Sequence, residues 1–353
     1  MTQTPFLSRL WIPVVLLAIA APWLISGYEL SLLGRFLAMS ILAIGLMLVW
    51  GEAGILTLGQ GVFFGLGGYA LAIHMKLAGL EPGSLPDFME WSGITALPWW
   101  WVPFKSPVLA TLMVVVVPGV FAGFFSWLVF RRRVVGVYFA LITQALALSF
   151  ATLLVSQQGA TGGFNGLTNF QTLYGFDLNA ARAPVVLYWV TLALVVVCFA
   201  GVRWLIRSRF GMLLRATRDG ENRVRFLGYD TTPYKVVAFT LAAMLAGIGG
   251  ALFTLHAGVI SPALVGVVPS IEMVVWVAVG GRGSLWGAVI GTLAVNFAKD
   301  EISSYLPGAW LYVLGLVFIL VVGFLPRGIM GLAEDLTRRS ARKPQPQPVE
   351  APQ

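Results

Sequence analysis

The sequence repeats stretches of about 20 apolar residues, each long enough to cross a hydrocarbon core roughly 30 Å thick. Only 11% of the residues are charged, against roughly a quarter in soluble domains. Hydropathy places apolar runs at about 10–27, 31–50, 53–75, 107–130, 134–155, 184–206, 236–255 and 308–325, with room for two more in 259–298. We therefore predict an all-α, polytopic inner-membrane protein of about ten transmembrane helices, in a range of about eight to ten.

Two features leave the number of spans open. Residues 280–283 read Gly-Gly-Arg-Gly, and this break could be the tip of a re-entrant hairpin, which protein or a water-filled cavity would have to cover. Near the N-terminus, Ala18-Ile19-Ala20 resembles a signal-peptidase site. The apolar run continues beyond that site to Gly27, so we expect the first span to be retained.

Basic residues set the expected orientation, because basic loops stay on the cytoplasmic side of a membrane. Arginines at 131–133, the loop 207–235, Arg282 and the basic tail fall on one side when the spans alternate. We predict that both termini are cytoplasmic. The transmembrane domain is expected over 1–335, with a cytoplasmic loop at 207–235, outer loops at 77–106 and 156–183, and a disordered, proline-rich cytoplasmic tail over 336–353.

The chain has little that could catalyse a reaction. It contains no GxxxxGK[ST] phosphate loop, no HExxH and no GxSxG. The one cysteine, Cys198, lies in an apolar run and allows no intrachain disulfide. We predict no catalytic residue, no metal site and no nucleic-acid partner, despite the net charge of +8.

Glycines and uncharged polar residues share several apolar runs. Glycines spaced by four residues lie on one helix face and predict close helix packing, whereas broken helices lining a pathway are the alternative. The packing candidates are Gly61, Gly65, Gly283, Gly287 and Gly291. Amides and hydroxyls can exchange hydrogen bonds with a neutral solute, and the pathway candidates of this kind are Thr57, Gln60, Gln144, Asn165 and Asn296.

Glu272 is the one acid well placed to enter a span. An intramembrane carboxylate is a functional candidate because burying it is expensive, and Glu272 joins the pathway hypothesis on that ground. A position at the end of a span, where the carboxylate reaches water, is the alternative. An array of such carboxylates is missing from the sequence, which disfavours ion-coupled transport.

The loop 207–235 is the longest internal segment expected in the cytoplasm. Its small, uncharged side suits docking into a groove on a partner protein, with Gly220 and Gly228 separating two short helices. The alternative is a basic segment lying on anionic lipid. The residues expected to dock are Gly211, Leu213, Leu214, Ala216, Thr217, Arg218, Gly220, Leu227 and Gly228.

This loop resembles the coupling loop of permease subunits in ATP-binding-cassette (ABC) importers for branched-chain amino acids, short amides and urea. Three further stretches are similar to the same family: 54–69, 161–167 (Thr-Gly-Gly-Phe-Asn-Gly-Leu) and 279–287. Together the similar stretches run from about residue 30 to 335. Residues 51–61 and 261–273 look most like the second permease subunit of urea importers.

The resemblance implies a transport subunit of a bacterial inner membrane that is not an enzyme. The expected partners are a related permease subunit in a heterodimer, two cytoplasmic ATPase subunits that hold ATP and Mg, an extracytoplasmic solute-binding protein and membrane lipid. This chain would bind no cofactor itself. Urea is the expected solute. The alternatives are branched-chain amino acids or short amides in the same importer class, a stand-alone channel or secondary carrier, and a structural scaffold.

Overall fold

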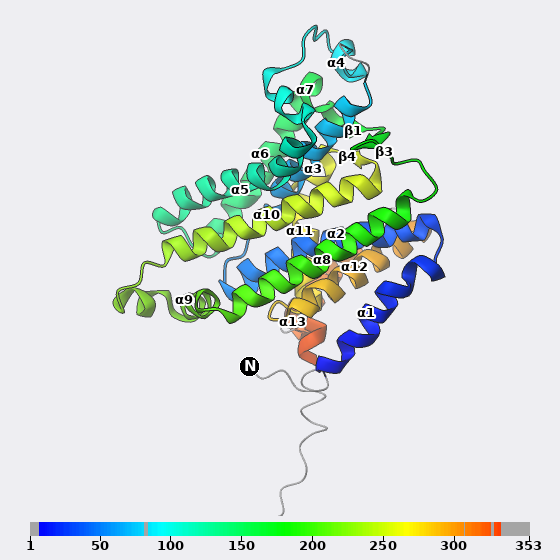
Figure 1. Cartoon of the computed structure of the whole chain (residues 1–353). Helices are drawn as coiled ribbons and strands as arrows, with labels where there is room; N and C mark the ends of the chain where they lie inside the picture. The colour runs from blue at the N-terminus through cyan, green and yellow to red at the C-terminus, as the bar shows by residue number, and fades with distance from the viewer. Residues whose placement is uncertain (1–6, 81–83, 307, 326–327, 333–353) are drawn as a thin grey trace, which may run out of the picture.

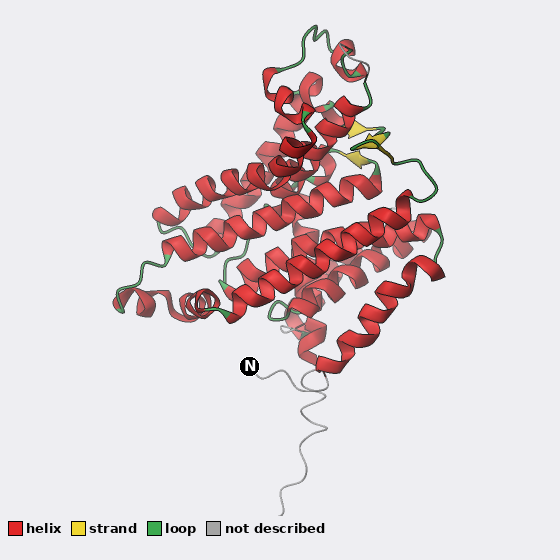
Figure 2. Cartoon of the chain, viewed as in Figure 1, coloured by secondary structure: helices red, strands yellow, loops and turns green. Residues whose placement is uncertain are grey.

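The chain folds as a bundle of helices in a computed structural model that describes residues 7–80, 84–306, 308–325 and 328–332. Figure 2 shows that helices dominate and that strands are few and short. The helices and strands are α1 (Leu7–Leu24), α2 (Gly27–Met47), η1 (Leu48–Glu52), α3 (Gln60–Ala78), α4 (Asp87–Trp91), η2 (Trp99–Lys105), α5 (Pro107–Arg131), α6 (Val137–Ser156), α7 (Gln158–Thr161), η3 (Gly163–Asn165), β1 (Leu167–Thr168), β2 (Thr172–Leu173), β3 (Phe176–Asp177), α8 (Ala183–Arg207), α9 (Arg209–Phe226), α10 (Thr232–Ala257), β4 (Val259–Ile260), η4 (Pro262–Leu264), α11 (Val267–Gly280), α12 (Leu285–Tyr305) and α13 (Trp310–Phe324). The expected tail, 336–353, lies outside the described residues.

Within the described residues, six helical segments are long and apolar enough to cross a membrane. They are α2 with η1, α3, α5, α6, α8 and α10, and the pair α11 and α12 makes a seventh if it is one bent span. Shorter apolar helices cover Val15–Leu24 and Trp310–Val321. The polytopic, mostly helical class is confirmed. About ten crossings would require both short helices and both arms of the bent pair to cross, so that number stays a prediction.

The helices differ in how much of their surface the bundle covers. In the most apolar window of α2, α3 and α10, between 67% and 78% of the residues are buried, against 28% to 33% in α5, α6 and α8. Helix α10 packs against α2, α3 and α5. Figure 1 shows α10 running alongside these helices. Helices α2, α3 and α10 therefore form the centre, and α5, α6 and α8 present broad apolar faces outward.

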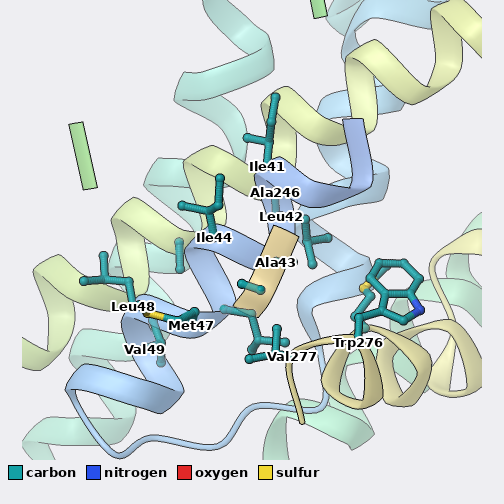
Figure 3. Close-up of a cluster of buried hydrophobic side chains, with 14 of the residues drawn as sticks. Ile41, Leu42, Ala43, Ile44, Met47, Leu48, Val49, Ala246, Trp276 and Val277 are labelled. Atoms are coloured by element: carbon teal, nitrogen blue, oxygen red, sulfur yellow. The ribbon is translucent and has the colours of Figure 1, made fainter. Parts of the chain in front are cut away.

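Figure 3 shows the centre of the bundle, where Ile41, Leu42 and Ile44 of α2 lie near Ala246 of α10 and Trp276 of α11. Each of these side chains is at most 2% exposed. Lipid tails are as apolar as leucine, so side-chain packing, rather than escape from water, holds such helices together. Precise packing at the centre therefore matters more here than it would in a soluble core.

Glycines allow the central backbones to touch. A Cβ at Gly250 would lie 1.9 Å from the carbonyl oxygen of Phe64, and one at Gly67 would lie 2.2 Å from that of Gly247. Real side chains do not fit at such distances, so glycine at these positions lets the backbones of α3 and α10 approach closely. The contact fixes α3, and with it the first residues of that helix, against the middle of the bundle.

Helices α11 and α12 form a hairpin, with a bend of 120° at the break between them. Helix α11 has 14 residues and is about 21 Å long at 1.5 Å per residue, shorter than a bilayer core of about 30 Å. Cβ atoms at Gly287 and Gly291 would lie 2.6 Å and 2.2 Å from α11 carbonyl oxygens, whereas one at Gly283 would meet nothing within 4 Å. Gly283 therefore takes no part in the packing expected of it.

Short elements cover the end of the bundle remote from α9. The loop 77–106 contains α4 and η2, and the loop 156–183 contains α7, η3 and three strands. Strand β1 pairs antiparallel with β4, which follows α10, with Leu167 opposite Ile260. Figure 1 shows these elements beyond one end of α10, with α9 at the other end.

Candidate translocation and coupling site

The path from α2 to α3 is broken inside the bundle. Helix α2 ends in the π-helical turn η1, residues 53–59 are not helical, and α3 begins at Gln60. We call residues 53–59 the unwound segment. Gly54 has φ +71°, and a Cβ there would also lie 2.6 Å from Cγ of Arg218. Glycine is therefore required both by the left-handed backbone and by the close approach of Arg218.

Four buried, uncharged polar residues surround the start of α3, and we call them the polar layer: Thr57, Gln60, Thr143 and Ser270. Each is at most 1% exposed. The Leu58 N–H donates to Thr143 Oγ1 at 3.0 Å, and the Gly61 N–H donates to Ser270 Oγ at 3.2 Å. Side chains from α6 and α11 thus satisfy backbone donors that the broken helix leaves without partners.

The Gln60 carboxamide stands out in this layer. Its Oε1 and Nε2 atoms are both buried, and neither has a hydrogen-bond partner among the described residues. Leaving a buried polar group unpaired costs about 1–3 kcal/mol, so such a group calls for an explanation. A carboxamide offers two donors and one acceptor oxygen, which suits transient hydrogen bonds with a small polar solute.

The other predicted pathway residues lie elsewhere. Gln144 follows Thr143 on α6 and is half-buried. Asn165 is exposed in η3, in the loop 156–183, and Asn296 donates to the Thr292 carbonyl of its own helix at 2.8 Å. Of the predicted set, only Thr57 and Gln60 belong to the polar layer. Ser270, which belongs to it, was missed because a serine near a helix start has no distinctive sequence pattern.

Glu272 is buried and fully paired. Its Oε2 accepts from Lys299 Nζ at 2.6 Å, and its Oε1 accepts from Trp310 Nε1 at 2.8 Å. The Glu272 side chain is 7% exposed and that of Lys299 is 39% exposed. These hydrogen bonds link α11 to α12 and α13 and involve no residue of the polar layer, and the role of Glu272 in the pathway stays a prediction.

The first half of α9 is attached to the end of α2. Arg215 Nη1 donates to Glu52 Oε2 at 2.8 Å, and Arg218 donates to the carbonyl oxygen of Gly51. Both arginines are in α9, whereas η1 supplies both acceptors. The structure thus connects the loop 207–235 directly to the turn that precedes the unwound segment.

The second half of α9 is attached to α10. The helical backbone breaks at Gly220, as the sequence predicts. Beyond it, Glu221 Oε1 accepts from Lys235 Nζ at 2.6 Å, from Arg225 Nη2 at 2.7 Å and from Thr231 Oγ1 at 2.9 Å. Burial by itself raises the pKa of the Glu221 carboxyl, but these hydrogen bonds and positive charges hold the pKa below its ordinary value.

The residues expected to dock divide between two faces of α9. Gly211, Leu214 and Thr217 are buried against this chain's own bundle, with Leu214 0% exposed. These three positions face this chain in the structure. Amphipathicity predicts the apolar face of a helix but not which surface covers that face. The exposed positions in and after α9 include Met212, Ala216, Arg218, Phe226, Leu227 and Gly228, while Leu213 and Gly220 are half-buried.

Comparisons with known proteins agree with a transport subunit. Residues 29–322 match the family described as branched-chain amino acid transport system / permease component. The chain is 26% identical over 342 residues to the high-affinity branched-chain amino acid transport system permease protein LivM of Escherichia coli, covering 90% of this chain and 74% of that protein.

Two further relatives extend the comparison. LivM of Salmonella typhimurium is 25% identical over 340 residues, covering 90% of this chain and 73% of the relative. The permease protein LivH of Escherichia coli is 23% identical over 310 residues, covering 84% of this chain and 92% of LivH. No solved structure matches.

Proposed function

Because the chain belongs to the family of branched-chain amino acid transport system permease components, we propose that it is a membrane subunit of an ABC importer that translocates urea. An extracytoplasmic binding protein would deliver the urea, and ATP hydrolysis by partner subunits would drive alternating access. The sequence has no phosphate loop of its own, so this mechanism takes its ATPase activity from another chain.

The polar layer carries the choice of urea. Urea is small, neutral and polar, and the buried side chains of Thr57, Gln60, Thr143 and Ser270 offer hydroxyl and amide partners without a fixed charge. The unpaired carboxamide of Gln60 adds a donor and an acceptor. Weak, reversible hydrogen bonds to such groups would let a neutral solute pass without being trapped.

A branched-chain amino acid is the second candidate solute. The LivM and LivH relatives bear that name, and α3 begins at Gln60, in the polar layer. A helix N-terminus carries a partial positive charge that suits the carboxylate of an amino acid. The side chains of the layer favour urea, whereas the relatives and this helix end favour an amino acid.

The assembly follows from the same family. We propose that the chain pairs with a related permease subunit and corresponds to the second of the two, and that two cytoplasmic ATPase subunits bind the complex. The partly uncovered helices α5, α6 and α8 offer apolar faces for a membrane partner or lipid. The exposed face of α9, with Phe226 91% and Leu227 77% exposed, would dock the ATPase.

Uptake in cells that lack only this chain tests the solute. Restoring the chain should restore uptake of labelled urea, and excess leucine should leave that uptake unchanged. If labelled leucine is taken up instead and urea does not compete, the amino-acid candidate replaces urea. Uptake by the purified chain at full rate without any ATPase would contradict the importer mechanism itself.

A pair of α9 substitutions tests the docking. Phe226→Glu with Leu227→Glu should abolish ATP-driven uptake while the chain still reaches the membrane, because both side chains are exposed. The matched pair Phe226→Leu with Leu227→Met keeps the surface apolar and should retain uptake. Normal uptake by the charged pair would show that the ATPase binds elsewhere.

A further inference from the structure

A pocket of about 160 Å³ lies beside α9. Its wall is formed by the unwound segment, by the connection from α5 to α6 with the adjoining ends of both helices, by α9 and by the start of α10. The lining residues that matter most here are Gly54, Ile55, Val135, Thr217, Arg218 and Glu221. The pocket exceeds the space that a single water molecule needs, so a small solute fits.

The two halves of α9 are held by ion pairs to different helices, and the α9 residues that line the pocket lie at or between these two ion pairs. Before Gly220, Arg215 pairs with Glu52 at the end of α2. After Gly220, Glu221 pairs with Lys235 at the start of α10. The pocket is lined by Arg218 and Glu221, which flank the break. A change of angle at Gly220 would therefore alter the separation of the two anchors and the shape of the pocket.

The unwound segment leads from this pocket to the polar layer. Ile55 lines the pocket, Thr57 follows two residues later, and Gln60 begins α3. Five residues of extended chain span at most about 17 Å, so the pocket and the polar layer lie within a short stretch of backbone. Arg218 of α9 lies against Gly54 in the unwound segment and donates to the carbonyl oxygen of Gly51, in the turn before that segment.

We propose that this pocket is the cytoplasmic exit chamber of the translocation pathway and that α9 is its gate. The proposal rests on the importer function proposed above and adds a site to it. Movement of α9 by the ATPase would open or close the chamber directly, and the link from Arg218 to the unwound segment would carry the same movement to the polar layer.

The charges around the chamber suit a small solute that is neutral or zwitterionic. Glu221 is paired with Lys235 and Arg225, and Arg218 is paired with Asp219 at 2.9 Å. Each of these side chains has a partner of opposite charge, and the three basic and two acidic groups leave one positive charge in excess, which disfavours a cation in the chamber. A solute leaving the polar layer would meet no strong binding site before the cytoplasm.

Thiol labelling of the complete importer tests the gate. With Cys198 replaced by serine, Ile55→Cys is labelled in inside-out proteoliposomes by a small, membrane-impermeant methanethiosulfonate reagent. The labelling rate should differ by about tenfold or more between the nucleotide-free importer and the importer trapped with ATP and vanadate. Arg132→Cys, exposed nearby but outside the chamber lining, should be labelled at one rate throughout.

Transport after labelling completes the test. Labelled Ile55→Cys should lose uptake of radioactive urea or leucine while ATP hydrolysis continues, because the attached group fills the chamber. Equal labelling rates in both states, or undiminished uptake after labelling, would overturn the proposal. If Ile55→Cys does not assemble, Val135→Cys, which lines the chamber and is 47% exposed, is labelled in its place.

The outcome separates this proposal from the importer function. ATP-dependent uptake by the importer with the unlabelled chain is measured first. If that uptake is absent, the proposed function itself fails. If it is present and labelling at both chamber positions changes nothing, the importer function stands and only the exit chamber is wrong.

Discussion

The two helix breaks inside the bundle treat polar groups in opposite ways. At the unwound segment the polar side chains are uncharged, and the Gln60 amide has no partner among the described residues. At the hairpin of α11 and α12, Glu272 is charged and each of its carboxylate oxygens has a partner. A fully paired charge suits a fixed joint, whereas an unpaired neutral amide suits a group whose partner comes and goes.

The largest effect is expected at the hairpin. Lys299→Met would leave the Glu272 carboxylate without its counter-charge, at a cost of about 3–5 kcal/mol when a buried pair is broken. Because the Lys299 side chain is partly exposed to solvent, the loss of stability should lie toward the lower value. Thermal unfolding in detergent measures this loss. The double variant Glu272→Gln with Lys299→Met, which removes both charges, should recover most of the stability, and an equally unstable double variant would contradict the pairing.

Gln60 should show the reverse pattern. Gln60→Leu removes an amide that makes no hydrogen bond with any described residue, so thermal stability should stay equal or rise. Uptake should fall by about tenfold, the equivalent of one hydrogen bond of about 1.4 kcal/mol, while ATP hydrolysis continues. Gln60→Asn keeps the amide one methylene shorter and serves as the control. A large loss of stability in Gln60→Leu would show that the amide is structural.

Thr143 tests the support of the unwound segment. Thr143→Val removes the acceptor of the Leu58 N–H and should cost about 1 kcal/mol of stability, seen as faster hydrogen exchange at residues 57–60. Thr152→Val on the same helix is the matched control, because the exposed Thr152 hydroxyl donates to the Leu148 carbonyl of its own helix. Equal effects at both positions would contradict the specific role of Thr143 in supporting the unwound segment.

The smallest effect concerns acid. The pKa of Glu221 lies below its ordinary value in the folded chain, so its pairing adds stability above the ordinary glutamate pKa. That stability is lost as the pH falls through the lower folded value. The protection factors of the amides at residues 221–226, which correct for the slower chemical exchange in acid, should therefore stay high at neutral pH and fall at about pH 4 and below. Glu221→Gln should remove this dependence on pH, and a dependence that persists would place its origin elsewhere.

Much of the bundle follows from the sequence, because apolar runs of about 20 residues have few ways to satisfy their backbones in lipid. The break at 280–283 was visible as a glycine cluster, and that at Gly220 as a glycine within a short amphipathic segment. The unwound segment was harder to predict, since 53–75 reads as one apolar run. Its break depends on Thr143 and Ser270, which are distant from it in the sequence. Their hydroxyl groups accept hydrogen bonds from backbone N–H groups that the broken helix leaves without partners.

Side-chain direction was the main thing that the sequence left undecided. Leu214 and Thr217 were correctly placed on the small-residue face of α9, but that face covers this chain's own bundle. Glu272 is buried, as its apolar surroundings in the sequence suggest, but its partner Lys299 is 27 residues away, and no sequence pattern links the two. Pairings between helices depend on how the helices pack, which periodicity along one helix does not encode.

The exposed end of α9 has a consequence for the life of the protein in the cell. A copy that has not assembled with its partner subunits would leave Phe226 and Leu227 exposed, at 91% and 77%. These are two large apolar side chains on an otherwise basic loop. Chaperones and quality-control proteases recognise such surfaces. The half-life of the subunit would then depend on how much of its companion is synthesised, and surplus copies would be degraded.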